Sequence, residues 1–479
     1  MADEETRETT EEGLAGRKSL SRREFLKYAG LAGATVAVGA GLGGLVAACG
    51  EGETTTTTTA GGPTTTGAGP STTEAPTTTV VTGPEPPAKD KIVIGAARPI
   101  SGVNALFEQA HFGPAYKLWV EDVNAAGGLN VAGKKMPIEL KIYDDQSDLD
   151  TSMRLLTKLM EEDKVDFVFA PCSTAFLFAA AGVANAHNYI LMSAEGGATT
   201  LENEMKKGKL PWFFQVLNYS NHAQMPMFAE ICKELGAKTT SVMYIDDLHG
   251  IEYQAQWQVF ASGAGIEILS NTAVPPGIKD VSSIVKKIQQ ENPDIVCSFQ
   301  YPPENILTIQ TMMQLNYNPK GVLVGPGGST QAIYDIFQGG MDGCMFEGAW
   351  SPKQSPEVKA YYEKLVQFVG GKANVDFWGP LIYRAELEFF GQAIEKAATL
   401  DQAKVAEVMR TAHFKTIMSE DTFFTNQLLD VSCYAGQIGQ WQNGFPQVID
   451  VGPKRTTDKI WYPKPTWAEA PALSTSSTT

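Results

Sequence analysis

The sequence predicts an α/β protein made of two lobes, each with a parallel sheet covered by helices. Short, continuous apolar runs alternate with helical patterns from residue 91 onward, and such runs are typical of parallel strands that are buried on both faces. This alternation occurs twice, over residues 91–200 and again over about 240–349. A chain of 479 residues also exceeds what one hydrophobic core usually serves.

In the first series we expect strands at residues 92–96, 138–143, 165–170 and 189–192, and helices at 111–124 and 150–162. In the second series we expect strands at residues 241–245, 295–299 and 321–324. Two long helices are expected at 356–369 and 380–398, and a hairpin joins 436–441 to 446–451. Asn443-Gly444 supplies the turn of this hairpin.

The composition excludes several classes of protein. The chain has 38 Lys and Arg against 54 Asp and Glu, a net charge of −16, which argues against a nucleic-acid partner because phosphate backbones are bound by basic clusters. Six cysteines are too few for a disulfide scaffold. Pairing stays open among five of them: Cys172, Cys232, Cys297, Cys344 and Cys433.

Residues 1–49 have the pattern of a bacterial export signal. Arg22 and Arg23 precede Phe25, and an uncharged, small-residue stretch follows over 28–48, as in the twin-arginine signal that it resembles. The alternative is a transmembrane anchor, since the stretch is just long enough to span a bilayer. Its six glycines favour the signal peptide.

Cys49 follows Val46-Ala47-Ala48, a sequence that resembles the lipobox of bacterial lipoproteins. Cleavage before Cys49 would leave an acylated cysteine as the mature N-terminus, and two or more acyl chains make a stable anchor. The alternative is an ordinary cleavage site with a chance cysteine. The Thr-, Gly- and Pro-rich residues 50–89 have no apolar periodicity, so we expect a disordered tether there. The predicted location is the extracytoplasmic face of the cell membrane.

No motif for catalysis, phosphate binding or metal binding is present. The sequence has no phosphate loop, no His-Glu-x-x-His and no Gly-x-Ser-x-Gly, so we expect neither an enzyme, a cofactor nor a metal site. Cys172 after a strand could be a nucleophile with His249 as its base. A half-buried thiol in a loop is the interpretation we favour.

Polar and aromatic residues gather where predicted strands lead into helices. These turns lie at 101–107, 171–174, 193–199, 246–250, 300–304 and 325–330. Taken singly, hydroxyl residues such as Ser173, Thr174 and Ser329 suit the N-cap of a helix. Ligands of open parallel sheets bind beyond the carboxyl ends of the strands, so the turns together predict a polar cleft.

Four motifs resemble the type 1 periplasmic binding proteins, in particular the leucine/isoleucine/valine-binding family of ABC transporters. They are Arg98-Pro99-Ile100-Ser101-Gly102, Val123-Asn124-Ala125-Ala126-Gly127-Gly128-Leu129, Tyr143-Asp144-Asp145 and Ala170-Pro171-Cys172-Ser173-Thr174. The resemblance extends from Asp90 to about Pro453. It implies two Rossmann-like lobes joined by three crossovers near 217–220, 350–354 and 422–426, with the ligand cleft between them.

The resemblance therefore implies the following division of the chain. The first lobe comprises residues 90–217 and 352–423, the second comprises 218–351 and 424–465, and 466–479 form a disordered tail.

The resemblance also implies nine ligand-binding positions: Phe107, Ser173, Thr174, Glu195, Gly196, Gly197, His249, Tyr301 and Gly327. Ser173 and the 195–197 loop would hold a carboxylate, while aromatic rings cover the rest of the ligand. His249 replaces a tyrosine of the family, and its charge could vary near neutral pH.

Gly327 is the main departure, because it occupies the place of a glutamate that pairs with the ammonium group of an amino acid. A buried ammonium group without a carboxylate partner is costly. Either Glu195 or another acid replaces that glutamate, or the ligand is not an α-amino acid.

These features predict a monomeric, lipid-anchored solute-binding protein. It would capture an amino acid, an amide or a related small carboxylate by lobe closure and deliver it to the permease subunits of an ABC transporter. Two alternatives stay open: a sensor that signals to a membrane partner without transport, and a secreted hydrolase that uses Cys172 and His249.

Overall fold

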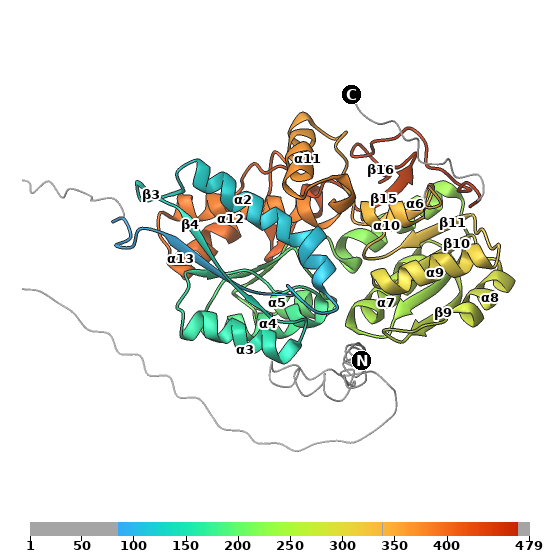
Figure 1. Cartoon of the computed structure of the whole chain (residues 1–479), viewed down its shortest axis with the longest axis horizontal. Helices are drawn as coiled ribbons and strands as arrows, with labels where there is room; N and C mark the ends of the chain where they lie inside the picture. Colours follow the sequence, from blue (N-terminus) through green and yellow to red (C-terminus); the bar gives the residue numbers. More distant parts are fainter. Residues whose placement is uncertain (1–84, 338, 468–479) are drawn as a thin grey trace, which may run out of the picture. The chain divides into compact units, whose positions relative to one another are not determined.

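Strands and helices alternate along the chain in the computed structural model, which describes residues 85–337 and 339–467 (Figure 1). Arg22, Arg23 and Cys49 lie outside the described residues, as do most of the predicted tether and tail. The first predicted series forms one group of sheets and the second series forms another. We call these groups, with their helices, the first and the second lobe.

The first lobe has two sheets. One has the order β4-β1-β5, with β1 (Ile92–Arg98), β4 (Ile138–Asp144) and β5 (Phe167–Val168) all parallel. The other has the order β13-β14-β7-β6, with β6 (Leu191–Ser193), β7 (Phe213–Gln215), β13 (Phe424–Thr425) and β14 (Leu428–Leu429). Residues on both faces of β1 are buried, as its continuous apolar sequence predicts.

Helices cover these sheets, with α3 (Leu149–Glu161) and α4 (Thr174–His187) below the strands in Figure 1 and α2 (Gly113–Ala125) and α12 (Gly379–Ala397) above them. A π-helical turn, η1 (Phe107–Phe112), leads into α2. The remaining elements are α5 (Thr199–Lys206), α13 (Gln402–Thr411) and the ribbon of β2 (Leu129–Val131) and β3 (Lys134–Met136).

The second lobe has one seven-stranded sheet of order β16-β15-β12-β11-β10-β8-β9. Its strands are β8 (Thr239–Ile245), β9 (Glu267–Val274), β10 (Ile295–Phe299), β11 (Gly321–Val324), β12 (Met345–Glu347), β15 (Ile438–Gln442) and β16 (Phe445–Val448). The last two are the antiparallel hairpin that the sequence predicts. Its helices are α6 (Met225–Leu235), α7 (Leu248–Gly263), α8 (Ser282–Glu291), α9 (Pro302–Gln314) and α10 (Gln331–Ile336).

Three connections join the lobes. The first runs over 216–219 into η2 (Ser220–Gln224). The second spans 348–378 and includes α11 (Pro356–Phe368) and η3 (Lys372–Asn374). The third spans 430–437 and includes η4 (Val431–Cys433).

The third connection corrects the predicted boundary at residue 424. Leu428 pairs with Gln215 of β7, so residues 424–429 belong to the first lobe. The Phe424 and Phe214 rings pack edge to face with their centroids 5.3 Å apart, and burial of these rings holds the segment on the first-lobe sheet. The prediction that 424–465 lies wholly in the second lobe is therefore wrong for its first residues.

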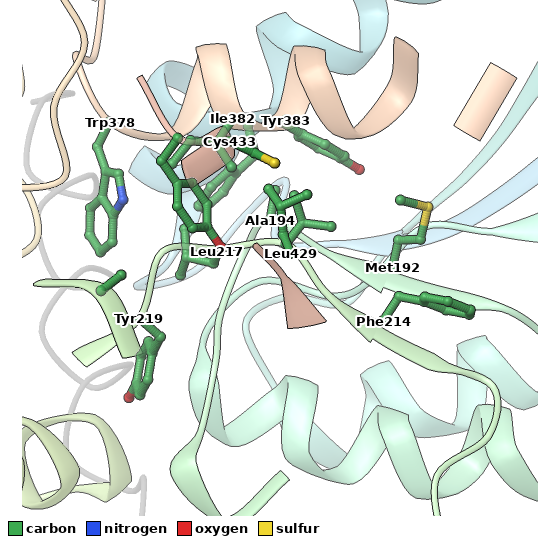
Figure 2. Packing of buried hydrophobic residues seen from close by; sticks show 14 of the residues in the cluster. Met192, Ala194, Phe214, Leu217, Tyr219, Trp378, Ile382, Tyr383, Leu429 and Cys433 are labelled. Carbon is green, nitrogen blue, oxygen red and sulfur yellow. The ribbon is translucent and has the colours of Figure 1, made fainter. Parts of the chain in front are cut away.

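Asn218 ties the three connections together. Its side-chain amide accepts a hydrogen bond from Trp378 Nε1 at 2.7 Å and donates to Gly436 O at 3.1 Å and to Gln437 Oε1 at 2.9 Å. Figure 2 shows the adjoining apolar cluster, with Trp378 on the side away from Met192 and Phe214. One buried amide thus links all three segments about which the lobes would move.

The structure bears on two questions from the sequence: whether the cysteines pair, and whether a helix could span a membrane. Cys172, Cys232, Cys297, Cys344 and Cys433 are all free thiols and all buried. In the described part of the chain, no helix is both long and apolar enough to cross a bilayer.

Candidate functional site

The ends of strands from both lobes converge on a cavity of about 40 Å³. It is lined by Phe107, His111, Phe112, Cys172, Ser173, Thr174, Glu195, Gly196, Leu217, Tyr219, His249, Tyr301, Pro326 and Trp378. Seven of the nine predicted positions are among them. The space is small, so the two walls lie close together.

The other two predicted positions, Gly197 and Gly327, are not part of the cavity lining. A Cβ atom on Gly197 would come within 2.7 Å of Tyr219 Cγ, so glycine there allows the Tyr219 ring to lie against the 194–198 loop. A Cβ atom on Gly327 would instead meet Pro302 and Ile333 of the second lobe. Gly327 also has a φ of +90°, a left-handed conformation that favours glycine.

The first-lobe wall is built on the N-terminus of α4. Ser173 occupies the N-cap position with φ 82° and ψ 154°, and among the described residues its hydroxyl makes no capping hydrogen bond. Instead, Ser173 N donates to Glu195 O at 3.2 Å, which joins the two loops of this wall. The first N–H groups of a helix lack intrahelical acceptors, so they and the Ser173 hydroxyl suit an anionic group in the cavity.

Beneath this wall lies a buried ion-pair network centred on Arg98. Its Nε donates to Glu108 Oε2 at 2.9 Å, and its Nη1 donates to Glu195 Oε1 at 2.5 Å and to Ala170 O at 2.7 Å. Lys117 Nζ also bonds Glu108, at 2.8 Å. Burial raises the pKa of Glu195 to about 7, against the lowering effect of Arg98. Glu195 therefore lines the cavity with its Oε1 bound to Arg98, while its buried Oε2 has no hydrogen-bond partner among the described residues.

The second-lobe wall is aromatic. The His249 and Tyr301 rings stack with their centroids 5.2 Å apart, and Tyr301 meets Phe107 of the first lobe edge to face at 6.2 Å. Burial lowers the pKa of His249 to about 3. The expectation that its charge varies near neutral pH is therefore wrong, because the buried imidazole stays neutral there.

The predicted positions and turns do not include five residues that line the cavity: His111, Phe112, Leu217, Tyr219 and Trp378. His111 Nδ1 lies 3.1 Å from Asp376 Oδ2. Tyr219 OH lies 3.5 Å from Thr174 Oγ1 of the first lobe. Tyr219 and Trp378 lie in the connections rather than in strand-to-helix turns. Tyr219 falls within the predicted crossover at 217–220, whereas Trp378 lies outside the predicted crossover at 350–354.

Cys172 has the wrong environment for a nucleophile. Its side chain is buried, and burial raises the pKa of its thiol well above the usual range, with Glu195 adding to the rise. The thiolate is the reactive form, and it is disfavoured at this position. In the described residues, no three His, Cys, Asp or Glu side chains are grouped to hold a metal ion.

A larger cavity of about 240 Å³ lies beside α5 and the third connection, lined in part by Glu202, His222 and Leu428. The Glu202 carboxylate is already bonded to His222 Nδ1 at 3.0 Å and to Asn221 Nδ2 at 2.7 Å. The residues lining it do not follow the strand ends of both lobes, so we take the interlobe cavity as the candidate site.

Comparison with known proteins identifies the relatives of this chain. The model of the family described as "Periplasmic binding protein" matches residues 91–443. A "Leu/Ile/Val-binding protein homolog 8" from Brucella abortus is 25% identical over 313 residues, 59% of this chain and 74% of that protein. A "Leucine-, isoleucine-, valine-, threonine-, and alanine-binding protein" from Pseudomonas aeruginosa is 25% identical over 333 residues, covering 69% and 84%.

Two solved structures show the fold. The substrate-binding protein LivJ from Streptococcus pneumoniae, in complex with isoleucine, has a TM-score of 0.62 at 18% identity and covers 74% of this chain and 97% of its own. A solute-binding protein from Rhodopseudomonas palustris BisB5, in complex with 3,4-dihydroxybenzoic acid, has a TM-score of 0.62 at 16% identity, covering 79% and 99%. The predicted fold and family are confirmed.

Proposed function

The chain belongs to the periplasmic binding protein family, and on this premise we propose that it is the solute-binding protein of an ABC transporter. It captures a small polar solute in the interlobe cavity and delivers it to the permease. The observation that supports this is the convergence of strand-end residues from both lobes on one cavity. Small-molecule sites form preferentially at the interfaces between domains or lobes.

The two walls suggest which solute is bound. The N-terminus of α4 and the Ser173 hydroxyl offer donors to a carboxylate or carbonyl group. Phe107 and Tyr301 offer apolar surface for the body of the ligand. Glu195 is bound to Arg98, and Gly327 brings no carboxylate to the cavity. We therefore propose a small carboxylate, an amino acid or an amide, with the carboxylate as the group that is recognised.

The relatives support this range of ligands. The LivJ structure contains isoleucine, and the Rhodopseudomonas palustris structure contains an aromatic acid. Both are small carboxylates, and only isoleucine has an ammonium group. Since no carboxylate stands at Gly327, an amino acid would need Glu195 as the partner of its ammonium group, whereas an acid without an ammonium group needs no such partner.

A thermal-shift screen of the full chain against amino acids, amides, urea and small carboxylates tests the proposal. A ligand that binds only the folded state stabilises it by about 2.7 kcal/mol at a concentration of 100 times its Kd. We expect at least one carboxylate to raise the Tm by several degrees, an effect that grows with concentration. If no compound of these classes raises the Tm, the proposed solute class is wrong.

Lobe closure is the proposed capture mechanism. The three connections would act as the hinge of a rigid-body motion, with Asn218 at their meeting point. Small-angle scattering should show that the solute from the screen reduces the radius of gyration. An unchanged radius with a solute that raises the Tm would contradict closure.

We also propose twin-arginine export and lipid anchoring at Cys49, which place the binding domain outside the cytoplasm. The support is the order Arg22-Arg23 and then Val46-Ala47-Ala48-Cys49 in the sequence. Cys49→Ala should release the protein from membranes into the soluble fraction. Retention of this variant on membranes would rule out the lipid anchor.

A further inference from the structure

Glu252 of the second lobe reaches across to a helix of the first lobe. It lies on α7, and its Oε2 accepts a hydrogen bond from Thr199 N of α5 at 2.7 Å. Its Oε1 accepts from Thr200 Oγ1 at 3.2 Å and from Thr200 N at 3.5 Å. The Glu252 side chain is largely buried in this position.

The contact supplies a cap that α5 does not have in its own sequence. The N-cap residue of α5 is Ala198, which has no side-chain acceptor. The first N–H groups of any helix need acceptors from outside the helix. Here the acceptor for Thr199 and Thr200 belongs to the other lobe, so it is present only while the lobes are together.

We propose that Glu252 is a positioning residue that holds the cleft closed by capping α5 across it, and that closure is thereby linked to uptake of a proton. The consequence for solute capture rests on the proposed function, while the contact itself does not. Glu252 would add to the stability of the closed state without contacting the solute.

The same two elements build the cavity, so the cap positions both of its walls. His249 precedes Glu252 by one turn of α7, and Glu195 and Gly196 lie in the loop that leads into α5. When the Glu252 side chain docks on α5, His249 and the 195–197 loop are fixed at the same time. We call this contact between Glu252 and the N-terminus of α5 the latch. It affects the geometry of the site because α7 and the loop before α5 both carry residues that line the cavity.

The charges around Glu252 support the link to protons. Glu202 of α5 is a second carboxylate nearby, and the Tyr219 and Tyr253 hydroxyls also lie within electrostatic range. His249 on the same helix is uncharged near neutral pH. In the described residues, no Lys, Arg or His forms an ion pair with Glu252. Burial raises its pKa to about 7, and Glu202 adds to the rise.

The sign of the pH effect follows from this rise. An open cleft returns Glu252 to water and to an ordinary pKa of about 4.3, so closing favours the protonated acid. The closed state should be most stable at low pH and lose stability as the pH rises toward 7. The closing equilibrium should change by at most about tenfold per pH unit in this window, and it should be flat above it.

Hydrogen exchange of the Thr199 and Thr200 amides in the full chain, without any solute, tests the latch. These amides have no acceptor within α5, so protection at both of them reports on Glu252. After correction for intrinsic exchange rates, Glu252→Ala should speed their exchange at least about tenfold at pH 5. The Glu202 amide, which donates to Ala198 O within α5 at 3.1 Å, should keep its protection and report that the helix is folded.

Two further variants separate the cap from the charge. Glu252→Gln keeps an acceptor but cannot ionise, so its protection should stay at the low-pH level of the wild type from pH 5 to 8. Glu267→Gln, at an exposed glutamate of the same lobe, should behave as the wild type. In the wild type itself, protection should fall between pH 5 and 7.

Equal exchange at Thr199 and Thr200 in the wild type and in Glu252→Ala would overturn the latch. A wild-type protection that does not change with pH, or that falls equally in Glu252→Gln, would overturn its link to protons. If no solute raises the Tm, the hydrogen-exchange results on Glu252 still hold. If Glu252 does not protect the Thr199 and Thr200 amides, solute binding is unaffected, so the two proposals are tested separately.

Discussion

The two walls of the interlobe cavity differ in chemistry. The first-lobe wall offers a helix N-terminus and the Ser173 hydroxyl over the buried Arg98 and Glu195 pair. The second-lobe wall offers the stacked rings of His249 and Tyr301, neither of which is charged near neutral pH. The difference indicates a division of roles, in which the first lobe recognises the polar group of the solute and the second lobe covers the rest.

The largest change, in the free energy of unfolding, is expected from a substitution in the charged network under the first-lobe wall. Arg98→Ala removes the cation shared by Glu108 and Glu195 and leaves both carboxylates buried. Loss of one partner of a buried ion pair typically costs about 3–5 kcal/mol. Urea denaturation should therefore show a free energy of unfolding lower by that amount.

Arg154→Ala is the matched control, because Arg154 is exposed on α3 of the same lobe. Its free energy of unfolding should stay within about 0.5 kcal/mol of the wild-type value. If Arg98→Ala is as mild as this control, the first-lobe wall does not depend on the buried network.

A smaller effect is expected where the two lobes join. Asn218→Ala leaves the buried Trp378 Nε1 without its acceptor and frees Gly436 O and Gln437 from the first connection. A buried polar group without a partner costs about 1–3 kcal/mol. Thermal unfolding should show a lower Tm, while Asn130→Ala, at an exposed position of β2, should not. An unchanged Tm in Asn218→Ala would show that the three connections are not coupled through this amide.

The smallest effect is expected from protonation of the second-lobe wall. Because burial lowers the pKa of His249 to about 3, its imidazole NMR signals should not shift between pH 5 and 8. His187 is the internal control, since hydrogen bonds to Val183 O and Glu161 raise its pKa and it should titrate in the same spectra. A His249 titration within this range would mean that the second-lobe wall can carry a positive charge.

Local patterns in the sequence were sufficient to predict most of the fold. The apolar runs at 92–96, 295–299 and 321–324 all lie in strands, so the position of these strands follows from the residues themselves. The strand at 267–274 mixes polar and apolar residues and was missed. Strand β14 has only two residues, and its place beside β7 depends on contacts more than 200 positions apart, which no local pattern contains.

The candidate site was predictable to the extent that it follows from strand ends. Phe107, Ser173, Glu195, His249 and Tyr301 all follow parallel strands and all reach the cavity. The charge and the bonding partners of these side chains were not predictable, because they depend on burial and on residues far away in the sequence. Glu195 meets Arg98 across 97 positions, and His249 is neutral because of desolvation rather than its neighbours in sequence.

Isothermal titration of Ser173→Ala and Tyr301→Ala, with the solute that gives the largest thermal shift, tests the central claim most directly. One variant alters each wall of the same cavity. Loss of one buried hydrogen bond costs about 1–3 kcal/mol, so Ser173→Ala should weaken binding roughly 5- to 150-fold. Tyr301→Ala should weaken it at least about fivefold, because it removes the ring that stacks on His249 and meets Phe107. Ser262→Ala, at an exposed position of α7, should bind as the wild type does. Wild-type affinity in both cavity variants would place the binding site elsewhere.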